Sequence, residues 1–313
     1  MEAATTSART APSPKKQRVT DRAKAERKLA WTLCAPAVIA MLVVTGYPIG
    51  YAFYLSLQRS DLRFPDEKEF VGFSNYADVL TSSTWWSDVV TTLIITIISV
   101  SLELVLGMLI ALVMHRAIFG RGPVRAAILI PYGIVTVVAA FAWRYAFDPT
   151  SGFVPGLPLV PDDYAPLTNK EGSMFVIILA EVWKTTPFMA LLLLAGLALV
   201  PEVLLRAAQM DGAGAWKRLF KVIIPLIKPA ILVALLFRTL DAFRIFDNIY
   251  VITGGANNTG SVSILGYDNL FKAFNLGLGS AISVLIFLSV AIIAFIFITL
   301  FGAAAPGSDE ERH

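Results

Sequence analysis

Long apolar runs dominate the chain, and short polar segments separate them. Six runs each exceed the ~20 residues that an α-helix needs to cross the hydrocarbon core of a bilayer. They are Trp31–Leu57, Val89–Met114, Val124–Phe147, Met174–Val200, Val222–Phe246 and Ser280–Phe301. The runs do not alternate polar and apolar positions, which excludes barrel strands, and in lipid only helices and closed barrels satisfy every backbone group. The pattern therefore predicts an all-α membrane protein with six transmembrane helices.

Composition and charge support this class and add an orientation. Hydrophobic residues make up 56% of the 313-residue chain and charged residues 16%, against about a quarter charged in soluble domains. Lys and Arg gather in the N-terminal tail, in the loop after the second run and in segment 201–229, whereas the alternate loops carry few. The positive-inside rule then predicts a multi-pass protein of the cell membrane, with both termini and segment 201–229 in the cytoplasm. The net charge of +3 reflects this topology and does not indicate a nucleic-acid partner.

Three parts are expected along the chain. Residues 1–30 form a basic, partly disordered cytoplasmic tail, because Ala, Ser, Thr, Pro and basic side chains predominate there. Residues 31–302 form the six-helix transmembrane domain, and residues 303–313 form a cytoplasmic C-terminal tail. The remaining loops, 58–88, 148–173 and 247–279, have the length of a lid or a partner-docking rim and are too short for an independent catalytic domain.

The polar segment between Pro201 and Pro229 has the pattern of a helical hairpin. Good helix formers fill 203–210, Asp211-Gly212 breaks the helix, and a second short amphipathic helix is expected over 213–221. Pro225 marks the return to the bilayer, where a proline kink is tolerated. The residues alone leave two interpretations open, namely an amphipathic hairpin that lies on lipid headgroups and a docking surface for a partner protein.

Spacing within this hairpin resembles the "EAA loop" of bacterial ABC importer permeases. In that pattern Glu-Ala-Ala is followed by three residues, a glycine and, further on, a proline. Here the corresponding and adjacent residues are Arg206, Ala207, Ala208, Asp211, Gly212, Ala213, Phe220 and Pro225. The resemblance implies that they contact a separate ATPase. Arg206 departs from the family pattern because it occupies the position of the glutamate.

Three further segments resemble the MalF-like subfamily of binding-protein-dependent ABC sugar importer permeases. They are RAAILIPYGIVTVVAAFAWRYAFDP (125–149), WKTTPFMALLLLAGLALVP (183–201) and AFRIFDNIYVITGG (242–255). Together with the hairpin they imply a type I ABC importer permease fold over most of residues 30–302. Ala256-Asn257 and Thr91-Thr92 depart from the subfamily's usual Gly-Pro and Asn-Thr.

Charged residues at membrane depth are costly and usually face a bundle interior or an aqueous path. Here they are Glu103, Arg144, Glu181, Lys184, Arg238, Asp241 and Arg244. Helical spacing places Glu181, Lys184 and Thr185 on one face, and Asp241, Arg244 and Asn248 on another. The alternative to a solute site is that Glu181 with Lys184, and Asp241 with Arg238 or Arg244, neutralise each other and hold helices together.

The subfamily's sugar-contacting positions fall on several of these residues. By resemblance, the substrate-binding set is Tyr132, Thr136, Glu181, Lys184, Thr185, Asp241 and Arg244. A neutral polyol needs such a mixture of donors and acceptors, since each desolvated hydroxyl left unpaired costs ~1–3 kcal/mol. These residues differ in charge from the mostly uncharged contacts of the family.

The resemblance implies a transport subunit and not an enzyme. It would carry a sugar, a disaccharide such as trehalose, inward by alternating access; the alternatives are another carbohydrate, glycerol phosphate, or a proton-coupled secondary transporter. The chain has only two histidines, His115 and His313, so no metal site is expected on it. It has no GxxxxGK[ST] loop and no cofactor is expected, and a dimer of ATP-binding subunits would bind ATP and Mg²⁺. The other implied partners are membrane lipid, an extracytoplasmic sugar-binding protein or lipoprotein, and a second homologous permease, either a different chain or a copy.

Overall fold

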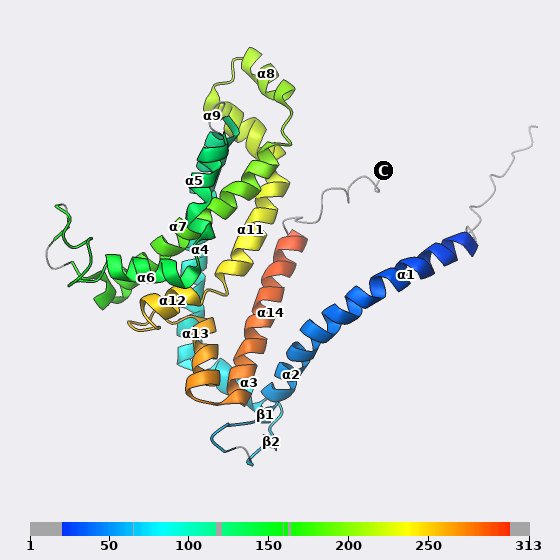
Figure 1. Ribbon diagram of the computed structural model, residues 1–313, viewed down its shortest axis with the longest axis vertical. Helices are drawn as coiled ribbons and strands as arrows, with labels where there is room; N and C mark the ends of the chain where they lie inside the picture. The colour runs from blue at the N-terminus through cyan, green and yellow to red at the C-terminus, as the bar shows by residue number, and fades with distance from the viewer. Residues whose placement is uncertain (1–20, 65, 117–120, 159, 162–163, 301–313) are drawn as a thin grey trace, which may run out of the picture. The chain divides into compact units, whose positions relative to one another are not determined.

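The computed structural model describes residues 21–64, 66–116, 121–158, 160–161 and 164–300. The expected C-terminal tail and residues 1–20 of the expected N-terminal tail lie outside this part. The chain divides between Tyr51 and Ala52 into two compact units. The described part of the first unit is a continuous helical segment, in which α1 (Asp21–Met41) passes through a π-helical stretch, η1 (Leu42–Gly46), into α2 (Tyr47–Ser56) (Figure 1). Helix α2 begins in the first unit and ends in the second.

The second unit is built around long apolar helices. Among the described residues, four helices are long and apolar enough to cross a membrane: the segment Lys28–Ser56, which begins in the first unit, and α4 (Ser83–Arg116), α7 (Lys170–Leu197) and α14 (Leu276–Leu300). Helices α4 and α7 pack along each other. Gly107 permits their close approach, because a Cβ there would lie 2.8 Å from Cγ of Met189. The expected all-α membrane fold is confirmed, with up to six spans when the broken helices are included.

Two of the six expected spans are not straight helices, which corrects the sequence-based prediction. The run Val124–Phe147 divides into α5 (Arg121–Gly133) and α6 (Thr136–Ala146), whose axes differ by 84°. Glycine is a poor helix former, and after Gly133 the chain becomes extended at Val135 (φ −57°, ψ 131°). A helix-to-helix bend of this size needs such a local cause.

The run Val222–Phe246 is broken in the same way. Its first part comprises α9 (Ala215–Arg218), the π-helical η3 (Leu219–Ile223) and α10 (Ile224–Leu226), and its second part is α11 (Lys228–Ala242). The two parts meet at 72°. Pro225 and Pro229 flank the bend, and neither can donate a helical hydrogen bond. The expected helix 213–221 therefore begins later, at Ala215, and continues to Leu226.

Short elements fill the loops between the long helices. A two-stranded antiparallel ribbon pairs β1 (Gln58–Arg59) with β2 (Glu69–Phe70). The other short elements are α3 (Ser74–Thr81), η2 (Pro166–Thr168), α8 (Glu202–Met210), α12 (Asp247–Ile252), α13 (Val262–Tyr267) and η4 (Asp268–Lys272). Helix α12 packs against α6 and α7, and α13 packs against α4 and α14.

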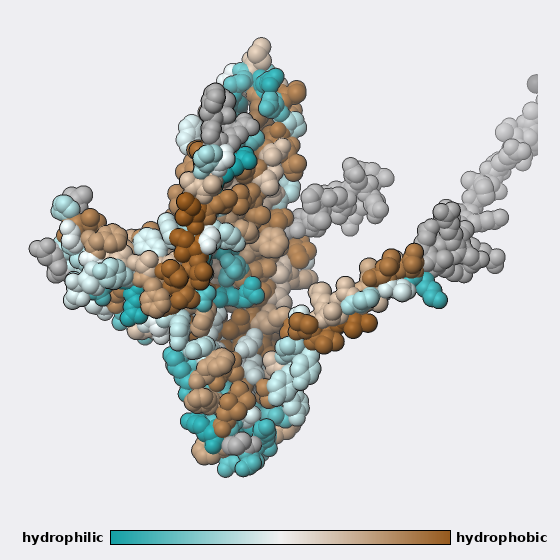
Figure 2. Space-filling view, in the orientation of Figure 1, coloured by the Kyte–Doolittle hydropathy of each residue, from teal (hydrophilic) through white to brown (hydrophobic). Residues whose placement is uncertain are grey.

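Apolar side chains both fill the core and cover its outside. Ile95, Ile177 and Ile249 are completely buried where α4, α7 and α12 meet, and Met189 and Leu193 are completely buried between α7, α4 and α11. Figure 2 shows hydrophobic residues over much of the surface of the long helices, with hydrophilic residues gathered near α8 and near β1 and β2. An apolar exterior between two polar ends is the surface that a bilayer requires.

Candidate functional site: a polar cavity between broken helices

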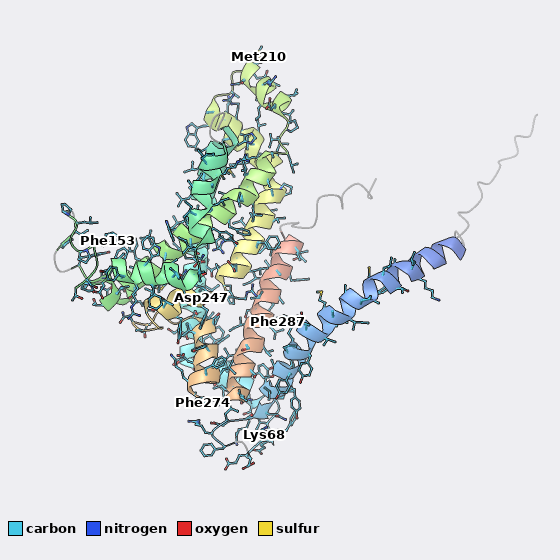
Figure 3. The ribbon with its side chains drawn as sticks, in the orientation of Figure 1. Lys68, Phe153, Met210, Asp247, Phe274 and Phe287 are labelled. Atoms are coloured by element: carbon cyan, nitrogen blue, oxygen red, sulfur yellow. The ribbon has the colours of Figure 1, made fainter. Side chains whose placement is uncertain are left out.

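A cavity of about 570 Å³ lies where α5, α6, α7, α11 and α12 converge. Its lining comprises Tyr132, Ile134, Val135, Thr136, Glu181, Lys184, Thr185, Asp241, Arg244, Ile245, Phe246, Asp247 and Asn248. Asp247, at the first turn of α12, marks its position in Figure 3. The structure thus brings together all seven residues that the resemblance implied as sugar contacts.

The break between α5 and α6 forms one wall of this cavity. Carbonyl groups at the end of a helix have no partner within the helix. Lys184 Nζ donates to two carbonyl oxygens here, at 3.5 Å to Tyr132 in the last turn of α5 and at 2.6 Å to Ile134 in the break after it. The same ammonium lies 5.9 Å from the centre of the Tyr132 ring, within the range of a cation–π contact. The bend therefore supplies the groups that hold a buried lysine.

One alternative from the sequence was that Glu181 neutralises Lys184, and the structure contradicts it. Among the residues that the structure describes, no carboxylate lies within salt-bridge distance of Lys184. Glu181 instead accepts hydrogen bonds from Arg238 Nη2 at 3.2 Å and from Asn248 Nδ2 at 2.5 Å. The one-turn spacing on α7 places Glu181, Lys184 and Thr185 along the cavity as expected, but each binds a different neighbour.

Arg238 is the centre of the buried charge network. Its Nε lies 2.6 Å from Glu103 Oε2 and its Nη2 lies 2.9 Å from Glu103 Oε1, so this pair is bidentate. Nη2 also donates to Thr185 Oγ1 at 3.2 Å, and Nη1 donates to Asp241 Oδ2. Arg238 is 1% exposed and Glu103 is 0% exposed. One guanidinium therefore joins α4, α7 and α11 through three carboxylates.

The expected common face of Asp241, Arg244 and Asn248 does not exist as a helical face. Helix α11 ends at Ala242, and α12 begins only at Asp247. The three side chains reach the cavity from two helices and the turn between them. Asp241 pairs with Arg238 and not with Arg244, whose Nε donates to the Leu240 carbonyl oxygen at 3.3 Å.

Asn248 is a cavity residue that the sequence-based prediction of substrate contacts omitted. It is 2% exposed and it orients Glu181. Helical spacing had grouped it with Arg244, but the chain is not helical between Ala242 and Asp247, so this spacing does not explain its place in the cavity. Arg144, by contrast, lies outside the cavity lining, and its Nη1 donates to the Val251 carbonyl oxygen at 3.0 Å. It stabilises the C-terminal end of α12, where a cation is favoured.

Segment 201–229 forms the expected helix-turn-helix. Helix α8 ends in a Schellman motif, in which the Gly212 amide donates to the Gln209 carbonyl oxygen at 3.0 Å and the Ala213 amide donates to the Ala208 carbonyl oxygen at 2.9 Å. Gly212 has φ +75°, in the left-handed region that favours glycine. Met210 lies at the far end of the hairpin in Figure 3.

Arg206 lies on the solvent-exposed side of α8. Its Nη2 is 2.6 Å from Glu202 Oε2, one helical turn earlier, and about three quarters of each side chain is exposed. Such exposed pairs contribute ~0.3–0.5 kcal/mol. Trp216 and Phe220 stack at 5.8 Å between ring centroids and are both exposed. The hairpin therefore presents apolar and charged side chains together at its surface.

Side chains in both segments that depart from the subfamily pattern have defined structural roles, although Thr92 itself is the threonine that the pattern expects. Thr92 Oγ1 donates to the Asp88 carbonyl oxygen at 2.7 Å and accepts the Val262 amide at 3.2 Å, which joins α4 to α13. Asn257 has φ 57° and its Nδ2 donates to the Leu167 carbonyl oxygen at 2.8 Å. Asparagine tolerates the left-handed region better than most residues.

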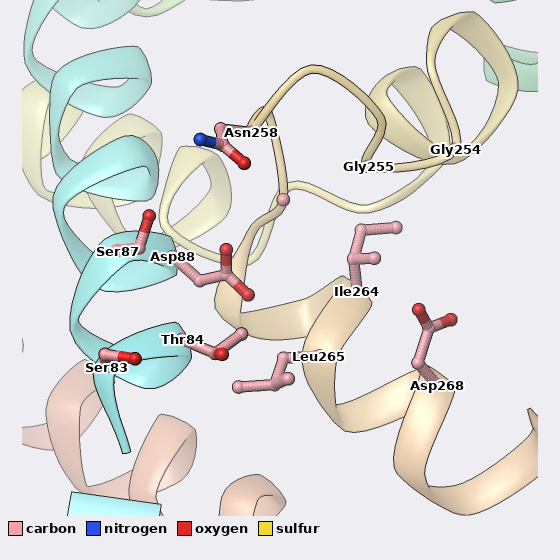
Figure 4. A pocket seen from close by; sticks show the side chains of 11 residues that line it. Ser83, Thr84, Ser87, Asp88, Gly254, Gly255, Asn258, Ile264, Leu265 and Asp268 are labelled. Atoms are coloured by element: carbon pink, nitrogen blue, oxygen red, sulfur yellow. The ribbon is translucent and has the colours of Figure 1, made fainter. Parts of the chain in front are cut away.

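A second polar cavity, of about 420 Å³, lies between the start of α4, the loop after α12, and the α13–η4 segment. Figure 4 shows Ser83, Thr84, Ser87 and Asp88 on α4, opposite Ile264, Leu265 and Asp268. Lys272 Nζ lies 2.7 Å from Asp268 Oδ1. No residue of this cavity was singled out as a site from the sequence.

Comparison with known proteins places these features in a family. Residues 71–305 match the family described as "Binding-protein-dependent transport system inner membrane component". The chain is 66% identical over 285 residues to the trehalose transport system permease protein SugA of Mycobacterium tuberculosis (strain ATCC 25618 / H37Rv), covering 91% of this chain and 92% of that protein. It is 39% identical to the trehalose/maltose transport system permease protein MalF of Thermococcus litoralis, covering 87% and 93%.

A solved structure shares the fold. It is a chain from the crystal structure of a bacterial alginate ABC transporter in complex with an alginate pentasaccharide-bound periplasmic protein. The TM-score is 0.76, and the match covers 92% of this chain and 99% of that chain at 18% sequence identity. At this identity the similarity concerns the fold alone.

Proposed function

Because the chain belongs to the binding-protein-dependent transport system inner membrane components, we propose that its cavity carries a disaccharide such as trehalose through an ATP-driven importer. The expected relation to MalF-like sugar permeases is confirmed by the relatives described above. The chain is a membrane-spanning transport subunit and not an enzyme, and an importer of this kind works with an ATPase and a binding protein. One observation carries the proposal: a 570 Å³ cavity with donors and acceptors on facing segments.

The charges of the lining favour a neutral sugar over glycerol phosphate. Two cations, Lys184 and Arg244, line the cavity together with the three carboxylates of Glu181, Asp241 and Asp247. A phosphate is usually bound by Arg or Lys groups or by free backbone amides, whereas here the three carboxylates outnumber the two cations and would repel a phosphate. Hydroxyl groups, which both donate and accept, match the mixed lining.

The hairpin is the proposed contact with the ATPase. The charge pattern of the loops supports a cytoplasmic position for it and for both termini. An ATPase dimer would bind ATP and Mg²⁺, a second permease of the same family would complete the pore, and a binding protein or lipoprotein would deliver the sugar from outside. The hairpin leads through α10 directly into α11, which runs towards α12 and carries Arg238 and Asp241 near its far end (Figure 1). A movement of the hairpin would therefore reach the cavity through one helix.

Reconstitution tests this proposal. The chain is purified with its ATPase, second permease and binding protein, and is placed in liposomes with labelled trehalose outside and ATP inside. We expect uptake that stops without ATP and without the binding protein. Uptake by this chain alone on a proton gradient would instead support a secondary transporter and contradict the proposal.

A first variant tests the cavity. Asp241→Asn removes one charged acceptor, and a hydrogen bond to a charged group contributes ~1.5–3 kcal/mol. We therefore expect the trehalose concentration for half-maximal binding to the purified complex to rise by about tenfold or more. Glu171→Gln, which removes an exposed carboxylate in the first turn of α7 outside the cavity lining, is the control and should leave binding unchanged. Unaltered binding by Asp241→Asn would exclude contact between Asp241 and the sugar.

A further inference from the structure

We propose that Glu103 and Arg238 are positioning residues for sugar selectivity: they hold Glu181 and Asp241 as fixed acceptors for particular hydroxyl groups of the sugar. The inference rests on the proposed function and assigns residues to it that the resemblance did not include. Neither Glu103 nor Arg238 belongs to the cavity lining, whereas the residues that Arg238 binds on α7 and α11 do. The Glu103–Arg238 pair therefore acts on the cavity through Glu181 and Asp241, which line it, without lining the cavity itself.

The guanidinium is suited to this arrangement by its shape. It is planar, with five N–H groups in fixed directions, whereas the ammonium of lysine is a single point of charge. The bidentate contact with Glu103, at 2.6 and 2.9 Å, fixes the plane of the Arg238 guanidinium. The N–H groups that remain are then directed at Glu181, Thr185 and Asp241. Glu103 thus sets the orientation of the Arg238 guanidinium, and the N–H groups on its other side hold the carboxylates of the cavity lining.

The two carboxylates retain capacity for a sugar. Each carboxylate oxygen can accept about two hydrogen bonds. Glu181 accepts one bond on each oxygen, from Arg238 and from Asn248. Asp241 Oδ2 accepts a hydrogen bond from Arg238 Nη1, and among the described residues none donates to Asp241 Oδ1. Free acceptor positions on both residues therefore remain for hydroxyl donors.

Donors line the same cavity as these acceptors. Lys184 Nζ is held by the Ile134 carbonyl oxygen, and a lysine ammonium has three donors. Within the described part of the chain, the terminal nitrogens of Arg244 have no hydrogen-bond partner. A hydroxyl at one position must then donate, and a hydroxyl at another must accept. Glu181 is 7% exposed, and a buried acceptor left without its hydroxyl is costly, so the lining discriminates against a sugar that lacks the hydroxyl at Glu181.

Without Arg238 this wall would not persist. Glu103, Glu181 and Asp241 carry like charges that meet at one guanidinium, and like charges so close repel one another. Glu181 and Asp241 would separate or turn away, even if the helices still assembled. Sugar affinity and sugar selectivity should therefore both depend on the buried pair.

The test measures sugar binding to the purified importer complex without the binding protein, since that protein makes its own selection. The probes are trehalose and trehalose analogues that each lack one hydroxyl. For Glu103→Gln and Arg238→Lys, which retain size and, in the second case, charge, we expect the Kd for trehalose to rise at least tenfold. We also expect the ratio of Kd values between the best-discriminated analogue and trehalose to fall to below about threefold. Arg144→Lys, the matched control, changes an arginine outside the cavity lining that binds a backbone carbonyl oxygen, and should leave both values unchanged.

A double-mutant cycle separates positioning from a general structural role. In a Glu181→Gln, Asp241→Asn background, the cavity lining no longer contains the two carboxylates that Arg238 holds, so Arg238→Lys cannot disturb their positions. The further rise in Kd for trehalose should then stay below about twofold, because residues that act through one another are not additive. If Arg238→Lys raised the Kd by the same factor in this background as in the wild type, the inference would be overturned. Trehalose binding within twofold of wild type in assembled Glu103→Gln and Arg238→Lys complexes would also overturn it. Absence of trehalose binding by the wild-type complex would contradict the proposed function itself.

Discussion

Gly212→Val is expected to abolish ATP-driven sugar uptake while the importer still assembles and binds sugar. Gly212 has φ +75° in the Schellman motif that ends α8, and a β-branched residue in the left-handed region is a strained outlier. The strain, of order 1–3 kcal/mol, would be relieved by opening the turn between the two helices. A hairpin of altered shape could not transmit ATP-driven movement, so we expect uptake to fall at least tenfold.

Two further variants define the cause of this loss. Gly212→Asn should retain most uptake, because asparagine also occurs at the left-handed position of such motifs. Gly214 has ordinary angles (φ −64°, ψ 172°), and a Cβ there meets nothing within 4 Å. Gly214→Ala should therefore transport at nearly the wild-type rate. The measurement is trehalose uptake and ATP hydrolysis by proteoliposomes of equal complex content, and wild-type uptake by Gly212→Val would remove the case for a coupling hairpin.

Arg238→Met is expected to have the largest effect on stability. It leaves Glu103, which is 0% exposed, without its cation. Breaking one partner of a buried ion pair costs ~3–5 kcal/mol, because the remaining charge is uncompensated. We expect a lower melting temperature of the purified complex and less assembled protein in the membrane.

Replacing both partners should separate stability from sugar binding. A buried ion pair exchanged for apolar residues of similar size is often neutral or stabilising. The double variant Glu103→Leu, Arg238→Met should therefore recover much of the lost stability while its trehalose affinity stays low, since Glu181 and Asp241 lack the group that holds them. Recovery of sugar affinity together with stability would contradict a positioning role for this pair.

Features that depend on neighbours along the chain were predicted from the sequence. Apolar run length predicted the membrane class, and Asp211-Gly212 predicted the turn that Gly212 makes with φ +75°. The face shared by Glu181, Lys184 and Thr185 followed from helical spacing because α7 is continuous there. These properties depend on propensity and periodicity, which act over a few residues.

The partners of the membrane-embedded charges were decided by the tertiary structure. Arg238 lies 135 positions from Glu103 in sequence, and no periodicity relates two such residues. One alternative from local spacing paired Glu181 with Lys184, but the bend between α5 and α6 gives Lys184 two carbonyl oxygens instead. Asn248 faces the cavity because α11 ends at Ala242 and the chain turns before α12. Interactions between residues close in sequence determined which segments enter the membrane. The bends at 133–135 and near Ile227, together with the packing of α4, α7 and α11, decided which charges meet. Burial makes this pairing necessary, because a buried charge without a partner is costly.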